Sequence, residues 1–168
     1  MKIYLTGFMG SGKSYWGRLL SQQLGLPFFD LDEQVEGSEG VPITEVFASK
    51  GEEYFRQLEK ETLHIISESH DSFVMAVGGG TPCYFNNIGY MKEQGETVWI
   101  NTPLDTLYKR LVNEKDKRPL LRDLSDEQLR AFISKKFSDR RIYYEQAGIH
   151  IDDEPLQPEK LIELLFHA

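Results

Sequence analysis

The sequence has little cysteine, no excess of positive charge and no long hydrophobic run. Its one cysteine, Cys83, cannot form an internal disulfide, which is typical of a reducing compartment. The net charge of −8 argues against nucleic acid or an anionic membrane as the main partner. The apolar residues that follow Lys2 are too few to cross a bilayer, and no signal-peptide cleavage site follows them. We therefore expect a cytoplasmic protein that binds neither nucleic acid nor membrane.

The composition suits one folded domain. The chain has 168 residues, of which 40% are hydrophobic and 12% aromatic, enough for a sizeable core. No shift in composition and no internal repeat marks a second unit. We expect a single domain over residues 1–168 that acts as a monomer.

Short apolar strands alternate with amphipathic helices along the chain. This alternation predicts an α/β fold with a parallel sheet between two layers of helices, and ligands beyond the carboxyl ends of the strands. The segment 113–123 is charged and has no apolar period, which is typical of a functional or a disordered loop. The expected strands are 2–6, 27–30, 72–77, 97–100 and 149–151, and the expected helices 13–24, 43–50, 52–69, 84–94, 103–112, 125–144 and 158–166.

Residues 7–14, GFMGSGKS, match the phosphate-loop pattern GxxxxGK[ST] at every fixed position. Glycines let backbone N–H groups point at phosphate oxygens, and the following helix adds the positive end of its dipole. Lys13 should reach the β- and γ-phosphates of ATP, and the Ser14 hydroxyl should ligate Mg²⁺. The alternative, a chance glycine turn, is disfavoured by the strand before the motif and the helix after it. The expected ATP-binding residues here are Gly10, Ser11, Gly12, Lys13, Ser14 and, through its backbone N–H, Tyr15.

Two carboxylates follow the second strand. On an extended backbone, Asp30 and Asp32 would point to the same side. We assign Asp30 to the magnesium shell, through water, and Asp32 to the hydroxyl that accepts the phosphoryl group. The alternative is a solvated pair that caps a helix beginning near Glu33. The neighbouring phosphate loop favours the first interpretation.

Several further residues have both a functional and an ordinary interpretation. Arg56 could be a surface residue paired with Glu59 one turn later. The triplet 78–80 could be a plain turn, although three glycines more often indicate close approach of another group. Arg118 could close over ATP from the segment 113–123, and Arg140 could face a pocket while its neighbour faces solvent. These patterns indicate an ATP-dependent kinase or NTPase and leave its substrate open.

The order and spacing of these motifs resemble the shikimate kinase family over nearly the whole chain. The phosphate loop is common to many families, whereas the combination of DxD, FRxxE, GGG and RPLL is more specific. The motifs are residues 7–14, 29–32, 47–51, 55–59, 78–80 and 118–121, together with Arg140 and Tyr144.

The resemblance implies a P-loop, nucleoside-monophosphate-kinase-like fold with a five-stranded parallel sheet in the order 2-3-1-4-5 and a mobile lid at about 113–123. It implies transfer of phosphate from ATP, with Mg²⁺, to the 3-hydroxyl of shikimate, giving shikimate 3-phosphate and ADP. This reaction belongs to the pathway to chorismate and the aromatic amino acids.

The resemblance also implies roles for individual residues. Catalysis would involve Lys13, Asp32 and Arg118, with Glu59 orienting Arg56. Arg110 would stack on adenine, and Arg140, chosen over Arg141 by its distance from Tyr144, would help Arg56 to clamp the substrate carboxylate. The expected shikimate-binding set is Asp32, Phe47, Phe55, Arg56, Gly78, Gly79, Gly80 and Arg140, although the two phenylalanines fit a core role equally well.

Three alternatives stay open at this point. A kinase of the same fold could act on gluconate or a nucleoside monophosphate. A nucleotide-binding module without turnover would not need Asp32. A P-loop GTPase would need a guanine-reading NKxD motif, which the sequence lacks.

Overall fold

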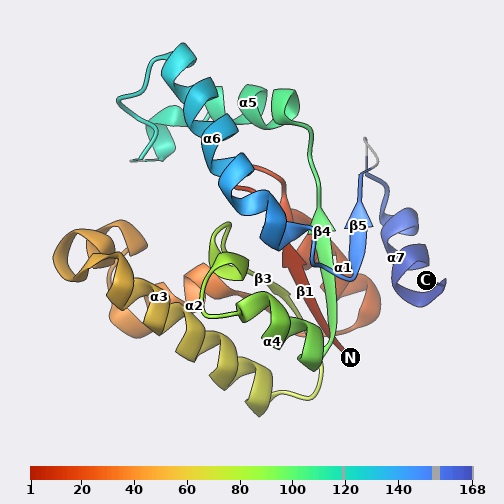
Figure 1. Cartoon of the computed structure of the whole chain (residues 1–168). Coiled ribbons are helices and arrows are strands. Elements are labelled where there is room, and N and C mark those ends of the chain that lie inside the picture. The colour runs from red at the N-terminus through yellow and green to blue at the C-terminus, as the bar shows by residue number, and fades with distance from the viewer. Residues whose placement is uncertain (119, 153–155, 168) are drawn as a thin grey trace.

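Five parallel strands form the centre of the computed structural model, which describes residues 1–118, 120–152 and 156–167. Their order across the sheet is β2-β3-β1-β4-β5, as the resemblance implied (Figure 1). Each strand pairs in parallel with its neighbours, with Leu5 of β1 opposite Ala76 of β3 and Val98 of β4. The strands are β1 Lys2–Thr6, β2 Phe28–Asp30, β3 Phe73–Ala76, β4 Glu96–Ile100 and β5 Ile149–Ile151.

Helices connect the strands and form the outer layers. They are α1 Lys13–Leu24, α2 Leu31–Glu39, α3 Ile43–Ser69, α4 Asn87–Gln94, α5 Leu104–Val112, α6 Asp126–Tyr144 and α7 Pro158–His167, with 3₁₀ turns η1 Thr81–Cys83 and η2 Lys115–Lys117. None of the described helices is long and apolar enough to cross a membrane.

The side-chain alternation of β1 explains the three layers. Ile3 and Leu5 point to one face of the sheet, where they pack with Leu20 of α1 and Leu161 of α7. Tyr4 points to the other face, in a cluster that also contains apolar side chains of α2, α3 and α4. A sheet buried on both faces needs apolar residues at successive positions, and β1 and β3 have them.

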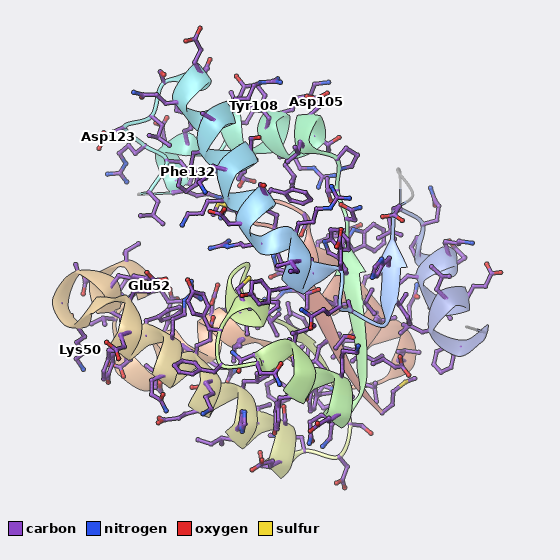
Figure 2. All side chains as sticks on the ribbon, in the orientation of Figure 1. Lys50, Glu52, Asp105, Tyr108, Asp123 and Phe132 are labelled. Carbon is purple, nitrogen blue, oxygen red and sulfur yellow. The ribbon has the colours of Figure 1, made fainter. Side chains whose placement is uncertain are left out.

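α5 and α6 form a separate layer above the carboxyl end of the sheet (Figure 1). Tyr108 of α5 and Phe132 of α6, both labelled in Figure 2, pack against one apolar cluster. Leu121, from the segment 113–123, is fully buried in the same cluster. α6 begins at Asp126, directly after the predicted N-cap Ser125, whose hydroxyl accepts a hydrogen bond from the N–H of Gln128 in a capping box.

Apart from one-residue shifts at the ends of several elements, the expected helices and strands differ from the structure in three places. The helices predicted at 43–50 and 52–69 lie in the single span α3, but Gly51, with φ +85° and ψ 168°, breaks it where the prediction put the gap. α4 begins at Asn87, three residues later than predicted, because Phe85 and Asn86 have left-handed φ values of +52° and +54° that an α-helix cannot contain. α2 follows β2 directly, whereas a helix here was expected only as the alternative to an extended DxD.

Candidate functional site

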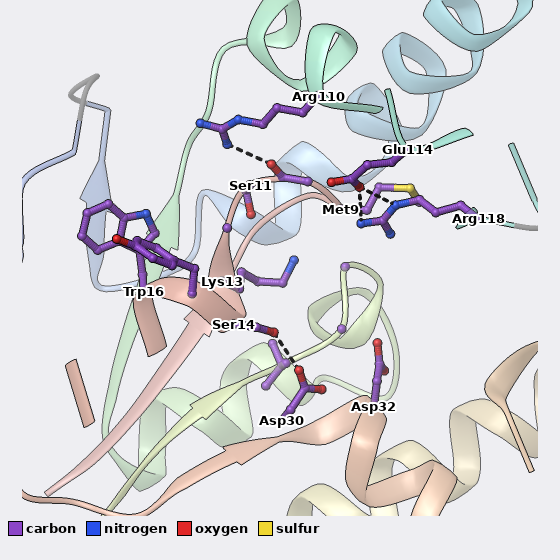
Figure 3. Close-up of a pocket in the computed structure, with 16 residues that line it drawn as sticks. Met9, Ser11, Lys13, Ser14, Trp16, Asp30, Asp32, Arg110, Glu114 and Arg118 are labelled. Carbon is purple, nitrogen blue, oxygen red and sulfur yellow. Dashed lines mark hydrogen bonds and ion pairs between the residues drawn. The ribbon is translucent and has the colours of Figure 1, made fainter. Parts of the chain in front are cut away.

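A cavity of about 560 Å³ lies at the carboxyl end of the sheet, where the connections after β1, β2 and β3 meet (Figure 3). This is the edge at which open α/β sheets bind ligands. The cavity is lined by Met9, Gly10, Ser11, Gly12, Lys13, Ser14, Tyr15, Trp16, Asp30, Asp32, Val77, Gly78, Gly79, Arg110, Glu114 and Arg118.

The phosphate loop has the backbone that its glycines allow. Gly10 and Gly12 have φ values of +83° and +91°, in the left-handed region that other residues avoid. The loop leads into the first turn of α1, and the residues of this turn line the cavity. The first N–H groups of a helix have no partner within the helix and can bind an anion. The buried hydroxyl of Ser11 has no hydrogen-bond partner among the described residues. An oxyanion bound in the loop fits this donor set.

Lys13 extends back over the loop. Its Nζ donates hydrogen bonds to the carbonyl oxygens of Gly7, at 2.7 Å, and Phe8, at 3.1 Å. The pKa of Lys13 is lowered to about 8, mainly by desolvation; the charge of Asp32 opposes this shift, and the charges of Arg140 and Arg118 contribute to it. A phosphate brought to this ammonium group would raise the pKa again, so that anion binding and protonation favour each other.

Ser14 and Asp30 form a paired oxygen site at the end of β2. The Ser14 hydroxyl donates to Oδ2 of Asp30 at 2.7 Å, and Oδ1 of Asp30 accepts from the N–H of Glu33 at 3.2 Å. Asp30 therefore caps α2, as the alternative interpretation proposed, and also reaches the cavity. A hydroxyl beside a carboxylate suits Mg²⁺, which prefers oxygen ligands and takes the rest from water and phosphate. The described residues contain no cluster of three His, Cys, Asp or Glu that could hold a metal by itself.

Asp32 also faces the cavity, but not for the reason that the sequence suggested. It lies in the first turn of α2 rather than on an extended strand, so the expected alternation is wrong. Burial, the charge of Glu59 and the charge of Asp30 raise the pKa of Asp32 to about 6, and Lys13 opposes the shift. A carboxylate of this pKa is ionised at neutral pH and binds protons more strongly than an ordinary aspartate.

Arg56 is a buried residue and not the surface residue of the ordinary interpretation. Only 7% of Arg56 is exposed, and its Nη1 lies 3.1 Å from Oε1 of Glu59, which is itself buried. The other carboxylate oxygen of Glu59 accepts a hydrogen bond from the Thr81 hydroxyl at 2.8 Å. Burial raises the pKa of Glu59, and Arg56 and Thr81 oppose this. Glu59 thus fixes the guanidinium group, as expected.

Tyr84 and Glu52, which were not among the expected site residues, also contact Arg56. Its guanidinium carbon lies 4.2 Å from the ring centroid of Tyr84 and 5.1 Å from that of Phe55. The Tyr84 hydroxyl donates to Glu52, which also pairs with Arg56 Nε at 3.4 Å. Tyr84 is separated from Arg56 by 28 positions, so no local pattern could reveal the contact; Glu52, four positions before Arg56, offered an i,i+4 signal.

The glycine triplet is packed against four charged side chains. A Cβ placed on Gly80 would lie 2.6 Å from Nη2 of Arg56, and one on Gly79 would lie 3.2 Å from Nη1 of Arg140. A Cβ on Gly78 would lie 3.1 Å from Oδ1 of Asp32 and 3.2 Å from Oε2 of Glu59. The triplet therefore brings two guanidinium groups and two carboxylates together around one short segment.

Arg140 and Arg141 face different surroundings. Arg140 is half-buried beside Gly79, while Arg141 is exposed and paired with Glu145 at 2.7 Å. One turn further along α6, the Tyr144 hydroxyl donates to the carbonyl oxygen of Gly79 at 2.6 Å. The choice of Arg140 over Arg141 agrees with this geometry.

The two phenylalanines lie in a core cluster. Phe47 and Phe55 pack with ring centroids 4.7 Å apart, against Val35 and Val46. Neither is among the described residues that line the cavity. The core interpretation accounts for Phe55, which is 3% exposed, while Phe47 is half-buried.

Arg110 and Arg118 enter the cavity from the side of α5. Arg118 is held by Glu114, with Nε and Nη2 each 3.0 Å from Oε2 (Figure 3). Arg110 donates from Nη1 to the carbonyl oxygen of Gly10 at 2.9 Å. Pro119, which follows Arg118 in the RPLL motif, lies outside the described residues.

Comparisons with known proteins agree with this geometry. The model of the shikimate kinase family matches residues 9–168. A shikimate kinase of Parabacteroides distasonis is 39% identical over 167 residues, covering 99% of this chain and 96% of that protein. The crystal structure of shikimate kinase from Bacteroides thetaiotaomicron is similar with a TM-score of 0.90 and 34% identity, covering 100% of this chain and 99% of that chain. Shikimate kinase from Acinetobacter baumannii, in complex with shikimate, gives a TM-score of 0.88 at 29% identity, covering 99% and 93%.

The match extends over the phosphate loop, the carboxylates after β2, the glycine triplet and the arginines around it. The chain belongs to the shikimate kinase family and is an ATP-using kinase of the shikimate pathway to the aromatic amino acids.

Proposed function

We propose that this enzyme binds shikimate beside the glycine triplet and transfers the γ-phosphoryl group of ATP to its 3-hydroxyl, giving shikimate 3-phosphate and ADP. The observation that carries the proposal is the convergence of Asp32, Arg56 and Arg140 on residues 78–80, next to the phosphate loop. One end of this site suits a carboxylate and the other a hydroxyl, which matches a hydroxylated acid such as shikimate.

Arg56 and Arg140 bind the substrate carboxylate in this proposal. Guanidinium groups bind carboxylates with two parallel hydrogen bonds, and Arg56 is already fixed by Glu59 and the Tyr84 ring. Gly78 and Gly79 line the same cavity, where their lack of side chains lets a substrate approach the backbone. Substrate binding therefore requires little loss of side-chain conformational entropy in the protein.

Asp32 acts on the hydroxyl that attacks. Its pKa of about 6 leaves it ionised at neutral pH, where it accepts a hydrogen bond from the hydroxyl and orients its oxygen towards the phosphate. A proton lost from the hydroxyl during transfer has Asp32 as its nearest acceptor in this arrangement. The raised pKa makes that acceptance more favourable than for an ordinary aspartate.

Lys13 and Arg118 stabilise the charge on the transferring group. Lys13 leaves the loop carbonyls for the β- and γ-phosphates, and Arg118 exchanges its contact with Glu114 for a phosphate oxygen. Ser14, and Asp30 through water, hold Mg²⁺, which neutralises the phosphates when it is bound. Residues 113–123 act as the lid of a single domain spanning 1–168, and Arg110 stacks on adenine.

The location and partners follow from the same proposal. The enzyme works as a monomer in the cytoplasm, where ATP is available and a single thiol stays reduced. Its partners are small molecules.

A coupled assay of ADP release with ATP, Mg²⁺ and shikimate tests the proposal, with gluconate and nucleoside monophosphates as control acceptors. Turnover with shikimate alone is expected. Turnover with a control acceptor instead would overturn the substrate assignment and leave the phosphate site intact.

The matched pair Arg140→Ala and Arg141→Ala tests the carboxylate site. Losing one charge-assisted interaction should raise KM for shikimate by roughly 10- to 100-fold, while KM for ATP changes much less. Arg141→Ala should leave both constants unchanged, because Arg141 is exposed and paired with Glu145. Equal effects of Arg140→Ala on both substrates would show that Arg140 serves another purpose.

A further inference from the structure

Two aromatic side chains line the end of the cavity away from Asp32. Tyr15 and Trp16 belong to the first turn of α1. Their rings meet edge to face, with centroids 5.2 Å apart and planes at 83°. Figure 3 shows Trp16 on one side of Lys13 and Asp32 on the other.

Trp16 is fixed between the phosphate loop and the core. Part of its side chain packs on the apolar cluster that α1 and α7 share. A Cβ placed on Gly12 would lie 3.3 Å from Cδ1 of Trp16, so the indole also rests against the loop itself. The indole is therefore a rigid wall of the cavity.

Tyr15 is different, because 66% of its surface is exposed. A singly exposed tyrosine is ordinary on a protein surface. This one, however, lines the nucleotide cavity, and its neighbour Trp16 holds the ring from the edge and leaves it accessible to a ligand.

The chemistry of the cavity fixes which half of ATP lies near these rings. The γ-phosphate must face Asp32, because the acceptor hydroxyl is bound there. The phosphates then run along the loop past Lys13, and the nucleoside leaves the loop at the opposite end. That end is bounded by Tyr15 and Trp16, with Arg110 above the loop at Gly10.

We propose that Tyr15 and Trp16 form the aromatic wall of the nucleoside subsite, with the Tyr15 ring packed on the ribose and base of ATP and Trp16 holding Tyr15 in place. The inference rests on the proposed orientation of ATP. It gives the side chain of Tyr15 a role at the nucleoside, beyond the backbone N–H that it offers to the phosphates.

Binding of ADP and of inorganic pyrophosphate, measured by calorimetry, tests the proposal. Tyr15→Ala should weaken ADP binding by about 5- to 150-fold, the range of losses when an aromatic platform under a base is removed. It should leave pyrophosphate binding unchanged, because pyrophosphate has no nucleoside. Tyr15→Phe should bind ADP like the parent enzyme, since the ring is kept.

Tyr54→Ala serves as the matched control, since Tyr54 is also an exposed tyrosine but lies on α3, away from the cavity. Its ADP affinity should equal that of the parent. If Tyr15→Ala weakens ADP and pyrophosphate equally, the side chain acts by supporting the loop, and the proposal is wrong. An unchanged ADP affinity in Tyr15→Ala would overturn it as well.

Trp16 provides a second, independent measurement. The chain has two tryptophans, and the other, Trp99, is 3% exposed in β4. Saturating ADP should change the tryptophan fluorescence of the parent enzyme, and Trp16→Phe, which keeps an aromatic ring against the core, should abolish the change. A change that persists in Trp16→Phe would contradict the placement of the nucleoside beside Trp16.

The outcomes separate this inference from the proposed function. An enzyme that phosphorylates shikimate, yet tolerates Tyr15→Ala without loss of ADP affinity, would disprove only the aromatic wall. An enzyme that does not phosphorylate shikimate would disprove the proposed function, whatever Tyr15 does.

Discussion

Asp32→Asn is expected to remove activity and at the same time to stabilise the fold. The neutral amide cannot accept a proton from the attacking hydroxyl and orients it less well, so kcat should fall by about 10²-fold or more. The stability effect follows from the raised pKa. Asp32 has a pKa of about 6 in the folded protein and an ordinary value of 3.8. Ionisation of Asp32 therefore destabilises the folded state relative to the unfolded chain.

The sign and size of the stability effect can be worked out. Below about pH 4 the carboxyl is protonated in both states and costs nothing. Between about pH 4 and pH 6 it ionises in the unfolded chain but not in the folded one, so stability falls as pH rises, and the loss stays constant above pH 6. A shift of about 2 pKa units corresponds to at most about 3 kcal/mol. Because Asp32 is partly exposed, solvent screening reduces this to roughly 1–2 kcal/mol.

Urea unfolding of the parent enzyme and Asp32→Asn, without ligands, at about pH 8 and about pH 4 checks this prediction. The variant should be more stable by roughly 1–2 kcal/mol at the higher pH and similar at the lower one. Glu33→Gln is the matched control, because Glu33 lies in the same turn of α2 but is exposed and paired with Arg18. An equal gain at both pH values, or none at pH 8, would refute the argument that the charge itself is destabilising.

Three further predictions concern the same site. In pH profiles, kcat/KM for shikimate should fall as pH drops through about 6, because Asp32 becomes protonated; a flat profile to pH 5 would contradict this. ADP affinity should fall as pH rises through about 8, because Lys13 loses its proton, and Lys13→Ala should be inactive, fold normally by circular dichroism and lose this pH dependence. Tyr144→Phe removes the hydroxyl that binds the Gly79 carbonyl, and should raise KM for shikimate roughly 3- to 10-fold with little change for ATP; a matching rise in both constants would assign Tyr144 to overall stability.

Local sequence patterns were sufficient to predict much of the fold. The strands, the start of α1 at Lys13, the Ser125 cap of α6 and the break at Gly51 depend on neighbouring residues, through apolar period, capping and glycine conformation. The strand order could not be predicted from local patterns. It was implied by the family resemblance, and the sheet confirms it. α2 was obscured because Asp30 is both the last residue of β2 and the cap of the helix, which leaves no loop between them.

The site was harder to predict where contacts join distant parts of the chain. Sequence spacing alone could not distinguish the buried Arg56 from a surface Arg–Glu pair, because both have the same i,i+3 pattern. Burial depends on Tyr84 and Thr81, which reach Arg56 and Glu59 from the far side of the glycine triplet. The same holds for Tyr144, whose partner Gly79 lies 65 positions earlier.

In a mutant library, substitutions at Gly80 of the triplet and at Gly51 of α3 should respond differently to selection for protein abundance and to selection for activity. Gly80 has φ −97°, a backbone conformation open to any residue, so a methyl group there competes with the guanidinium of Arg56 and not with the polypeptide. Gly51, with φ +85° and open space around it, has the opposite constraint. Alanine at position 80 should therefore be depleted more strongly by growth without aromatic amino acids than by sorting for protein abundance. Alanine at position 51 should already be depleted at the abundance step.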